Sequence, residues 1–260
     1  MKYIGFFKAD AMANVVNWIS VPAFFLYILC MAIAPWVQGG WDWIYVQSVW
    51  DRWQTLNTGV LAFGASVIAL NISRYHTNKQ RERRFVAAKA FLPHALSELI
   101  AYYKQCAKLL QEAWDLFENE ELRAPITLNT VAPELPRDHQ DIFNRCIEQA
   151  EPDVADYLAK ILMRLQIHNA RMKEMYLSLT QGDHTLVLQQ NVMSYLYSLA
   201  QLQVAANKLF PFARGMKTFD NTNPTWDDYR NAYANLDFWW EDFQDLEGFT
   251  KRALERENAV

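Results

Sequence analysis

Charged residues are missing from two long stretches near the start of this 260-residue chain. Residues 11–41 and 53–73 contain no Asp, Glu, Lys or Arg, and both are rich in apolar side chains. A bilayer core about 30 Å thick is crossed by roughly 20 helical residues. The sequence therefore predicts two transmembrane helices, at about 15–37 and 56–73, which form a membrane hairpin over residues 1–73.

Cysteine and glycine are also scarce. The three cysteines, Cys30, Cys106 and Cys146, are too few and too scattered for a disulfide framework or a metal knuckle, so buried free thiols are expected. Only three glycines follow Ala65, and no run there alternates polar and apolar residues as a strand does. These absences predict an all-α chain.

The common catalytic motifs are missing too. The chain has no glycine-rich phosphate loop, no Gly-x-Ser-x-Gly elbow, no His-Glu-x-x-His and no Cys-x-x-Cys. We therefore expect no catalytic residue, no metal site and no cofactor. His168 interrupts an apolar stripe, which predicts a core histidine bonded to a neighbouring polar group.

Basic residues flank the two uncharged stretches. Lys2 and Lys8 precede the first, whereas the connecting loop holds only Asp42, Asp51 and Arg52. Six basic residues follow the second: Arg74, Lys79, Arg81, Arg83, Arg84 and Lys89. Because basic residues stay inside, both termini are expected in the cytoplasm, with the hairpin in the inner membrane and its loop in the periplasm. The six side chains should also attract anionic lipid headgroups, at about 1 kcal/mol per charge.

Tryptophan is concentrated in the loop between the two stretches. Indole rings prefer the headgroup layer, where the ring is sheltered and the N–H stays wet. We interpret the loop as a short interfacial anchor, and a carbohydrate-stacking surface is the alternative. The anchor residues are Trp36, Trp41, Trp43, Trp50 and Trp53.

Small residues recur along the second stretch at alternating spacings of four and three. We call this row the small-residue seam: Thr55, Gly59, Ala62, Ser66, Ala69 and Ser73. Small side chains let helix backbones approach closely in lipid. The seam either packs against the first segment of the same chain or meets copies of itself in an oligomer. Asn57 and Asn71, near the segment ends, could line or hold together such an assembly, and an interface position on the cytoplasmic side is the alternative for Asn71.

The remaining residues, 74–260, are expected to form a cytoplasmic helical domain that begins with the basic juxtamembrane stub. Apolar residues at helical spacing predict four long helices over 85–116, 154–179, 188–209 and 226–243, packed as an antiparallel bundle. Pro93 should kink the first or mark a helix start. Residues 138–150 should form a short helix.

Two classes of function remain open. Eight acids against one base between Asp220 and Phe249 make nucleic-acid binding unexpected there. The first class is a non-enzymatic two-pass membrane protein whose cytoplasmic domain senses or binds a protein partner. Oligomerising, membrane-perturbing effectors of bacterial antiphage defence have this plan, as do regulatory anchors. The alternative is a membrane-anchored enzyme with a site inside the bundle.

Overall fold

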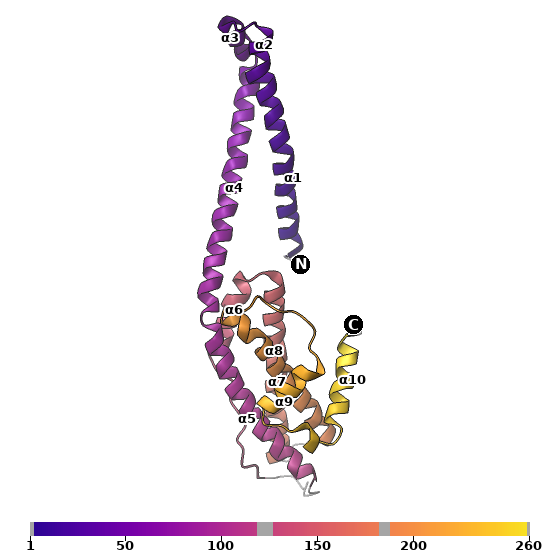
Figure 1. Cartoon of the computed structure of the whole chain (residues 1–260). Coiled ribbons are helices and arrows are strands. Elements are labelled where there is room, and N and C mark those ends of the chain that lie inside the picture. Colours follow the sequence, from indigo (N-terminus) through magenta and orange to yellow (C-terminus); the bar gives the residue numbers. More distant parts are fainter. Residues whose placement is uncertain (1–2, 119–126, 182–187, 259–260) are drawn as a thin grey trace. The chain divides into compact units, whose positions relative to one another are not determined.

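The computed structural model describes residues 3–118, 127–181 and 188–258, and these contain helices and connections but no strand. The all-α prediction is thus confirmed. The chain divides into two compact units, Met1–Gln80 and Arg81–Val260, which are described separately below (Figure 1).

The first unit is built from two long helical segments joined by a short helix. Helix α1 (Tyr3–Ile28) passes through a π-helical turn (Leu29–Ile33) into α2 (Ala34–Gln38) without a break. After α3 (Trp43–Arg52), helix α4 (Gln54–Lys89) carries both the second uncharged stretch and the basic stub. The first helical segment begins at Tyr3, whereas the sequence predicted a start at about residue 15, which is about twelve residues later.

The second unit contains six α-helices and one 3₁₀ turn among its described residues after α4. They are α5 (Leu92–Glu118), α6 (His139–Gln149), α7 (Pro152–Gln181), α8 (Gln189–Ala213), α9 (Trp226–Asn235), the 3₁₀ turn η2 (Trp240–Asp242) and α10 (Leu246–Asn258).

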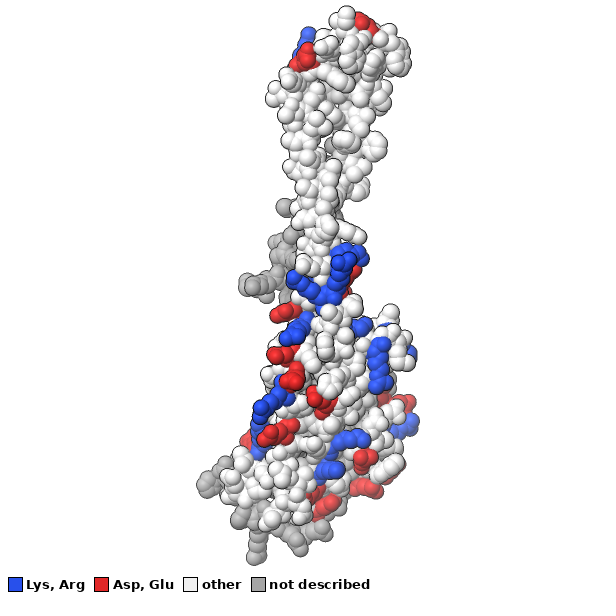
Figure 2. Space-filling view, turned by 90° about the vertical axis from the view of Figure 1, so that its left-hand side faces the viewer, with Lys and Arg blue, Asp and Glu red and all other residues white. Residues whose placement is uncertain are grey.

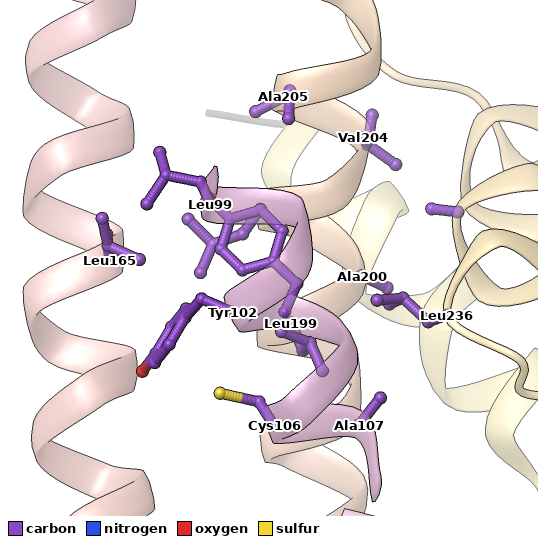
Figure 3. Packing of buried hydrophobic residues seen from close by; sticks show 14 of the residues in the cluster. Leu99, Tyr102, Cys106, Ala107, Leu165, Leu199, Ala200, Val204, Ala205 and Leu236 are labelled. Carbon is purple, nitrogen blue, oxygen red and sulfur yellow. The ribbon is translucent and has the colours of Figure 1, made fainter. Parts of the chain in front are cut away.

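The core of this unit forms around α5. Helix α5 packs most extensively against α8, while α6 and α8 both pack against α7. In Figure 3, Leu99 and Tyr102 of α5 lie beside Leu165 of α7, and Ala200 and Val204 of α8 lie behind them. Every one of these side chains is buried, so the apolar stripes read from the sequence do form a shared core.

Proline and its neighbours set where α5 begins. Helix α4 ends at Lys89 and α5 begins at Leu92, which places Pro93 in the first turn of α5. The missing N–H of a proline costs nothing there, because first-turn amides have no partner within the helix. Pro93 thus marks a helix start, which is one of the two outcomes predicted for it.

The last predicted helix is shorter than expected. A capping box between Thr225 and Asp228 starts α9, as both reciprocal bonds are present. The helix stops at Asn235 because Asp237 adopts a left-handed conformation with φ of 62°. The amide of Phe238 then donates to the carbonyl of Tyr233 at 2.9 Å, which closes a Schellman motif. Residues 236–243 continue the apolar spacing as a connection instead of a helix.

Candidate functional site

The uncharged stretches of α1–α2 and α4 are the strongest functional feature. Within the described residues, two helical stretches are long and apolar enough to cross a membrane: Asn17–Gln38, and a window within Gln54–Phe117. Very little of either window is buried within the chain. Apolar side chains such as Trp18, Phe25 and Leu61 therefore face outward. A surface of this kind is stable in lipid and costly in water.

Polar contacts at two places join the described side chains of α1 to those of α4. The amides of Asn17 and Asn71 bond reciprocally, with each Nδ2 donating to the other Oδ1 at 2.9 Å. Further along, the hydroxyl of Tyr27 donates to Oδ1 of Asn57 at 2.9 Å. Polar side chains that meet between helices satisfy each other where water is absent. Asn57 and Asn71, which were predicted to line or hold together an assembly, thus bond to α1 of the same chain.

The face of α4 that carries these two asparagines also carries its other half-buried residues. Val60, Gly64 and Val67 alternate with them at spacings of three and four. At about 100° per residue, this row lies on nearly the opposite side of α4 from the small-residue seam. The sequence did not predict which face of α4 turns toward α1. The signal for it was a polar residue in each uncharged stretch, Asn17 and Asn71, since two such residues can bond to each other.

The small-residue seam faces away from α1. All six of its members are exposed, and a Cβ added at Gly59 would meet nothing within 4 Å. The hydroxyl of Ser66 donates to the carbonyl of Ala62 at 2.8 Å, so it is satisfied within its own helix. The interpretation that the seam closes the hairpin on the first segment is therefore wrong. The interpretation that it meets another copy stays a prediction.

A short helix caps the turn between the two long segments. Asp42 accepts the amide of Ile44 at the start of α3, and α3 packs against α2 with Val46 fully buried. Gly39 has no room for a side chain, because a Cβ there would lie 2.5 Å from the ring of Tyr45. The loop is thus a folded, amphipathic helix and not merely a connecting turn.

Pro35 leaves one backbone carbonyl without its usual helical partner, and a side chain of α3 bonds that carbonyl instead. A proline lacks the N–H that would bond the carbonyl four residues before it, which is that of Met31. The indole Nε1 of Trp50 donates to the Met31 carbonyl at 2.7 Å. The π-helical turn at Leu29–Ile33 lies at the same place. Backbone groups exposed by a proline need such partners within a bilayer.

The predicted anchor tryptophans gather around this cap. The ring of Trp36 lies 5.8 Å from those of both Trp41 and Trp43, and the ring of Trp43 lies 6.2 Å from that of Trp50. Trp53 is half-exposed at the other end of α3. Four of the five thus form one aromatic cluster, with much of each ring left exposed except at Trp36.

Some of the predicted headgroup residues contact other parts of the helical domain, whereas others are exposed. Figure 2 shows Lys and Arg side chains gathering where the uncharged surface ends. Arg81 forms an ion pair with Glu151, and the ammonium of Lys89 lies 4.2 Å from the centre of the Phe212 ring. Arg81 and Lys89 therefore contact other parts of the helical domain. Arg83 and Arg84 are exposed, as a headgroup contact would require.

Three histidines of the helical domain, His94, His139 and His168, lie among the described residues after α4. His168 is buried, with only 1% of its surface exposed, but neither ring nitrogen has a hydrogen-bond partner among the described residues. The predicted polar neighbour of His168 is therefore wrong, although its place in the core is right. Burial lowers the pKa of His168 to about 4. His139 bonds the carbonyl of Pro136, and His94 is exposed beside Glu98.

Comparisons with known proteins give no relative. No protein-family model, no curated protein and no solved structure matches this chain.

The reciprocal amide pair gives a direct test of the hairpin. Replacing Asn17 and Asn71 by Leu, singly and together, should give a coupling free energy of about 1 kcal/mol, the size typical of polar contacts between membrane helices. The measurement is reversible unfolding of the full chain in mild detergent. Asn17→Leu combined with Thr58→Val is the control, since Thr58 bonds only its own helix. Coupling of equal size in the control pair would show that the contact is not specific.

Proposed function

We propose that this chain is a two-pass inner-membrane protein, with both termini in the cytoplasm, that assembles with copies of itself and binds a partner through its helical domain. The two uncharged helical stretches support the membrane location, and the basic residues after the second stretch support the orientation. The aromatic cluster around α3 supports an interfacial position for the turn.

The observation that carries the assembly is the position of the small-residue seam. The hairpin already uses the face of α4 that bears Asn57 and Asn71, and the seam lies on the other side. An identical face on every copy can pack against itself, and its small side chains permit close backbone approach. Copies are also what a membrane-perturbing effector needs, since a single pair of helices encloses no aqueous path.

The assembly can be tested by adding bulk to the seam. Gly59→Leu and Ala62→Leu should lower the oligomeric state of the full chain in mild detergent, because both block close approach of the helices. Leu61→Phe is the matched control, since it adds bulk on an exposed part of the same helix outside the seam. Cross-linking in membranes, followed by sizing in detergent, gives the readout.

Reporter fusions separate a failure of assembly from a failure of insertion. A reporter after Gly40 should report the periplasm, and one at Val260 the cytoplasm, in the parent chain and all three variants. Monomers at every expression level in the parent chain would refute self-association while leaving the anchored binding protein. A cytoplasmic signal after Gly40 would refute the hairpin itself.

A further inference from the structure

A groove of about 520 Å³ opens on the helical domain between α7, α8, α10 and the connection that follows α8. Its lining is rich in cations. Lys160 and Arg164 come from α7, Lys208 from α8 and Arg256 from α10, whereas Glu257 is the one carboxylate among the described residues that line it. The size is that of a site for a small organic ligand. Neither the composition of the chain nor the acidic segment after Asp220 suggested a basic site there.

The carboxylates in and near this groove are already engaged. Glu257 accepts from the Nε2 of Gln201 at 2.6 Å and lies 3.8 Å from Arg164. Asp220 accepts a hydrogen bond from the amide of Thr222 at 2.9 Å, and Asp228 accepts one from the amide of Thr225 at 2.8 Å in the capping box of α9. These acids therefore act on the local backbone and side chains of the groove wall, and only Glu257 forms an ion pair with a lining cation among the described residues.

The cations keep donors for another group. Lys160 has no hydrogen bond or ion pair within the described parts of the chain. Lys208 donates to both the carbonyl and the hydroxyl of Thr222, at 2.8 and 3.0 Å, which are uncharged acceptors. Arg256 uses its Nε on the carbonyl of Arg252, which leaves its two terminal amino groups. Four cationic side chains thus converge on one groove, in which Glu257 is the carboxylate among the described lining residues and Asp220 lies near Lys208.

We propose that this groove binds a small phosphorylated molecule through its phosphate groups. Lysine and arginine donors with free N–H groups match phosphate oxygens in charge and geometry. The connection 221–224 adds amide and hydroxyl groups to the same wall, which can bond the rest of such a ligand. The groove lies wholly within the second unit, so the inference goes beyond membrane assembly and does not depend on it.

The test uses the full chain in nonionic detergent with ATP, inorganic pyrophosphate and dioctanoyl phosphatidic acid as probes, measured by calorimetry. Pyrophosphate and ATP represent a free phosphorylated molecule, and the short lipid represents a headgroup. Lys160→Glu should weaken binding of the best probe by about tenfold or more, since it replaces an attraction by a repulsion at the same place. Arg256→Gln should weaken it in the same direction, and neither exposed side chain supports the core.

Lys173→Glu is the matched control, because it makes the same charge change at an exposed position of α7 away from the groove. Tightest binding of ATP or pyrophosphate, weakened in Lys160→Glu and Arg256→Gln but not in Lys173→Glu, supports a free phosphorylated ligand. Tightest binding of phosphatidic acid with the same dependence supports a headgroup as the source of the phosphate. The proposal is overturned if no probe binds, or if Lys173→Glu weakens binding as much as Lys160→Glu does.

Discussion

Lowering the pH from 7 to 4 is expected to remove about 3 kcal/mol of stability through His168 alone. Its imidazole is buried on α7, and burial, with a smaller effect from Arg171, lowers its pKa from 6.5 to about 4. The unfolded chain therefore binds a proton below pH 6.5, where the folded chain still does not. The stability is complete above pH 6.5, falls as the pH drops, and is fully lost near pH 4.

His168→Leu should make the helical domain less sensitive to acid. At neutral pH the change should cost little, because the described structure gives neither ring nitrogen a hydrogen bond to lose. Urea unfolding of the full chain in mild detergent, followed by far-ultraviolet circular dichroism at pH 7 and pH 4, measures both effects. Burial also lowers the pKa of His139, but His139 and the carboxylates are the same in both chains. The difference in acid sensitivity between the parent chain and His168→Leu therefore isolates His168.

His94→Gln is the matched control, since the side chain of His94 is largely exposed. It should keep the acid sensitivity of the parent chain. Equal loss of stability on acidification in the parent chain and in His168→Leu would show that His168 finds a hydrogen-bond partner, such as a buried water, in solution.

The helical core was largely predictable because its signal is local. The residues of α5 and α7 that the stripes singled out, from Leu92 to Ala113 and from Val154 to Leu179, are buried as their spacing requires. An apolar face repeated every three or four residues has few alternatives to a buried helix. The same reasoning predicted a helix to residue 243, whereas α9 ends at Asn235. Leu236 and Phe243 are buried in the core from the connection after α9, and their helical spacing is coincidental.

Features that depend on pairing between segments were not predictable. Helix α10 was missed because its sequence is dominated by charged residues, and Leu246 and Leu254 become meaningful only once α8 and α9 are in place. Likewise, the small-residue seam and the asparagine row are both plausible packing faces of α4 on sequence alone. The contact of Asn71 with Asn17, 54 residues away, decides between them. The groove cations come from three separate helices and share no motif.

Trp114→Ala is expected to have the largest effect on the helical domain, about 3–5 kcal/mol. Trp114 is 2% exposed on α5, and its ring centre lies 5.1 Å from that of Phe243. Phe243 in turn packs edge-on against Phe238, at 5.4 Å. Removing the indole therefore leaves a large cavity where α5 holds the connection between α9 and α10, and a close-packed core relaxes only partly around such a void.

Trp239→Ala is the matched control for this change. Trp239 lies in the same connection but is 59% exposed, so its removal should change stability by no more than about 0.5 kcal/mol. Hydrogen exchange of the full chain in detergent should show faster exchange in α9 and α10 for Trp114→Ala, with the uncharged part of α4 unchanged. Loss of stability of similar size in both variants would contradict the role of Trp114. Unchanged protection of α9 and α10 in Trp114→Ala would show that the connection is held by its own aromatic contacts, such as that of Trp226 with Trp240.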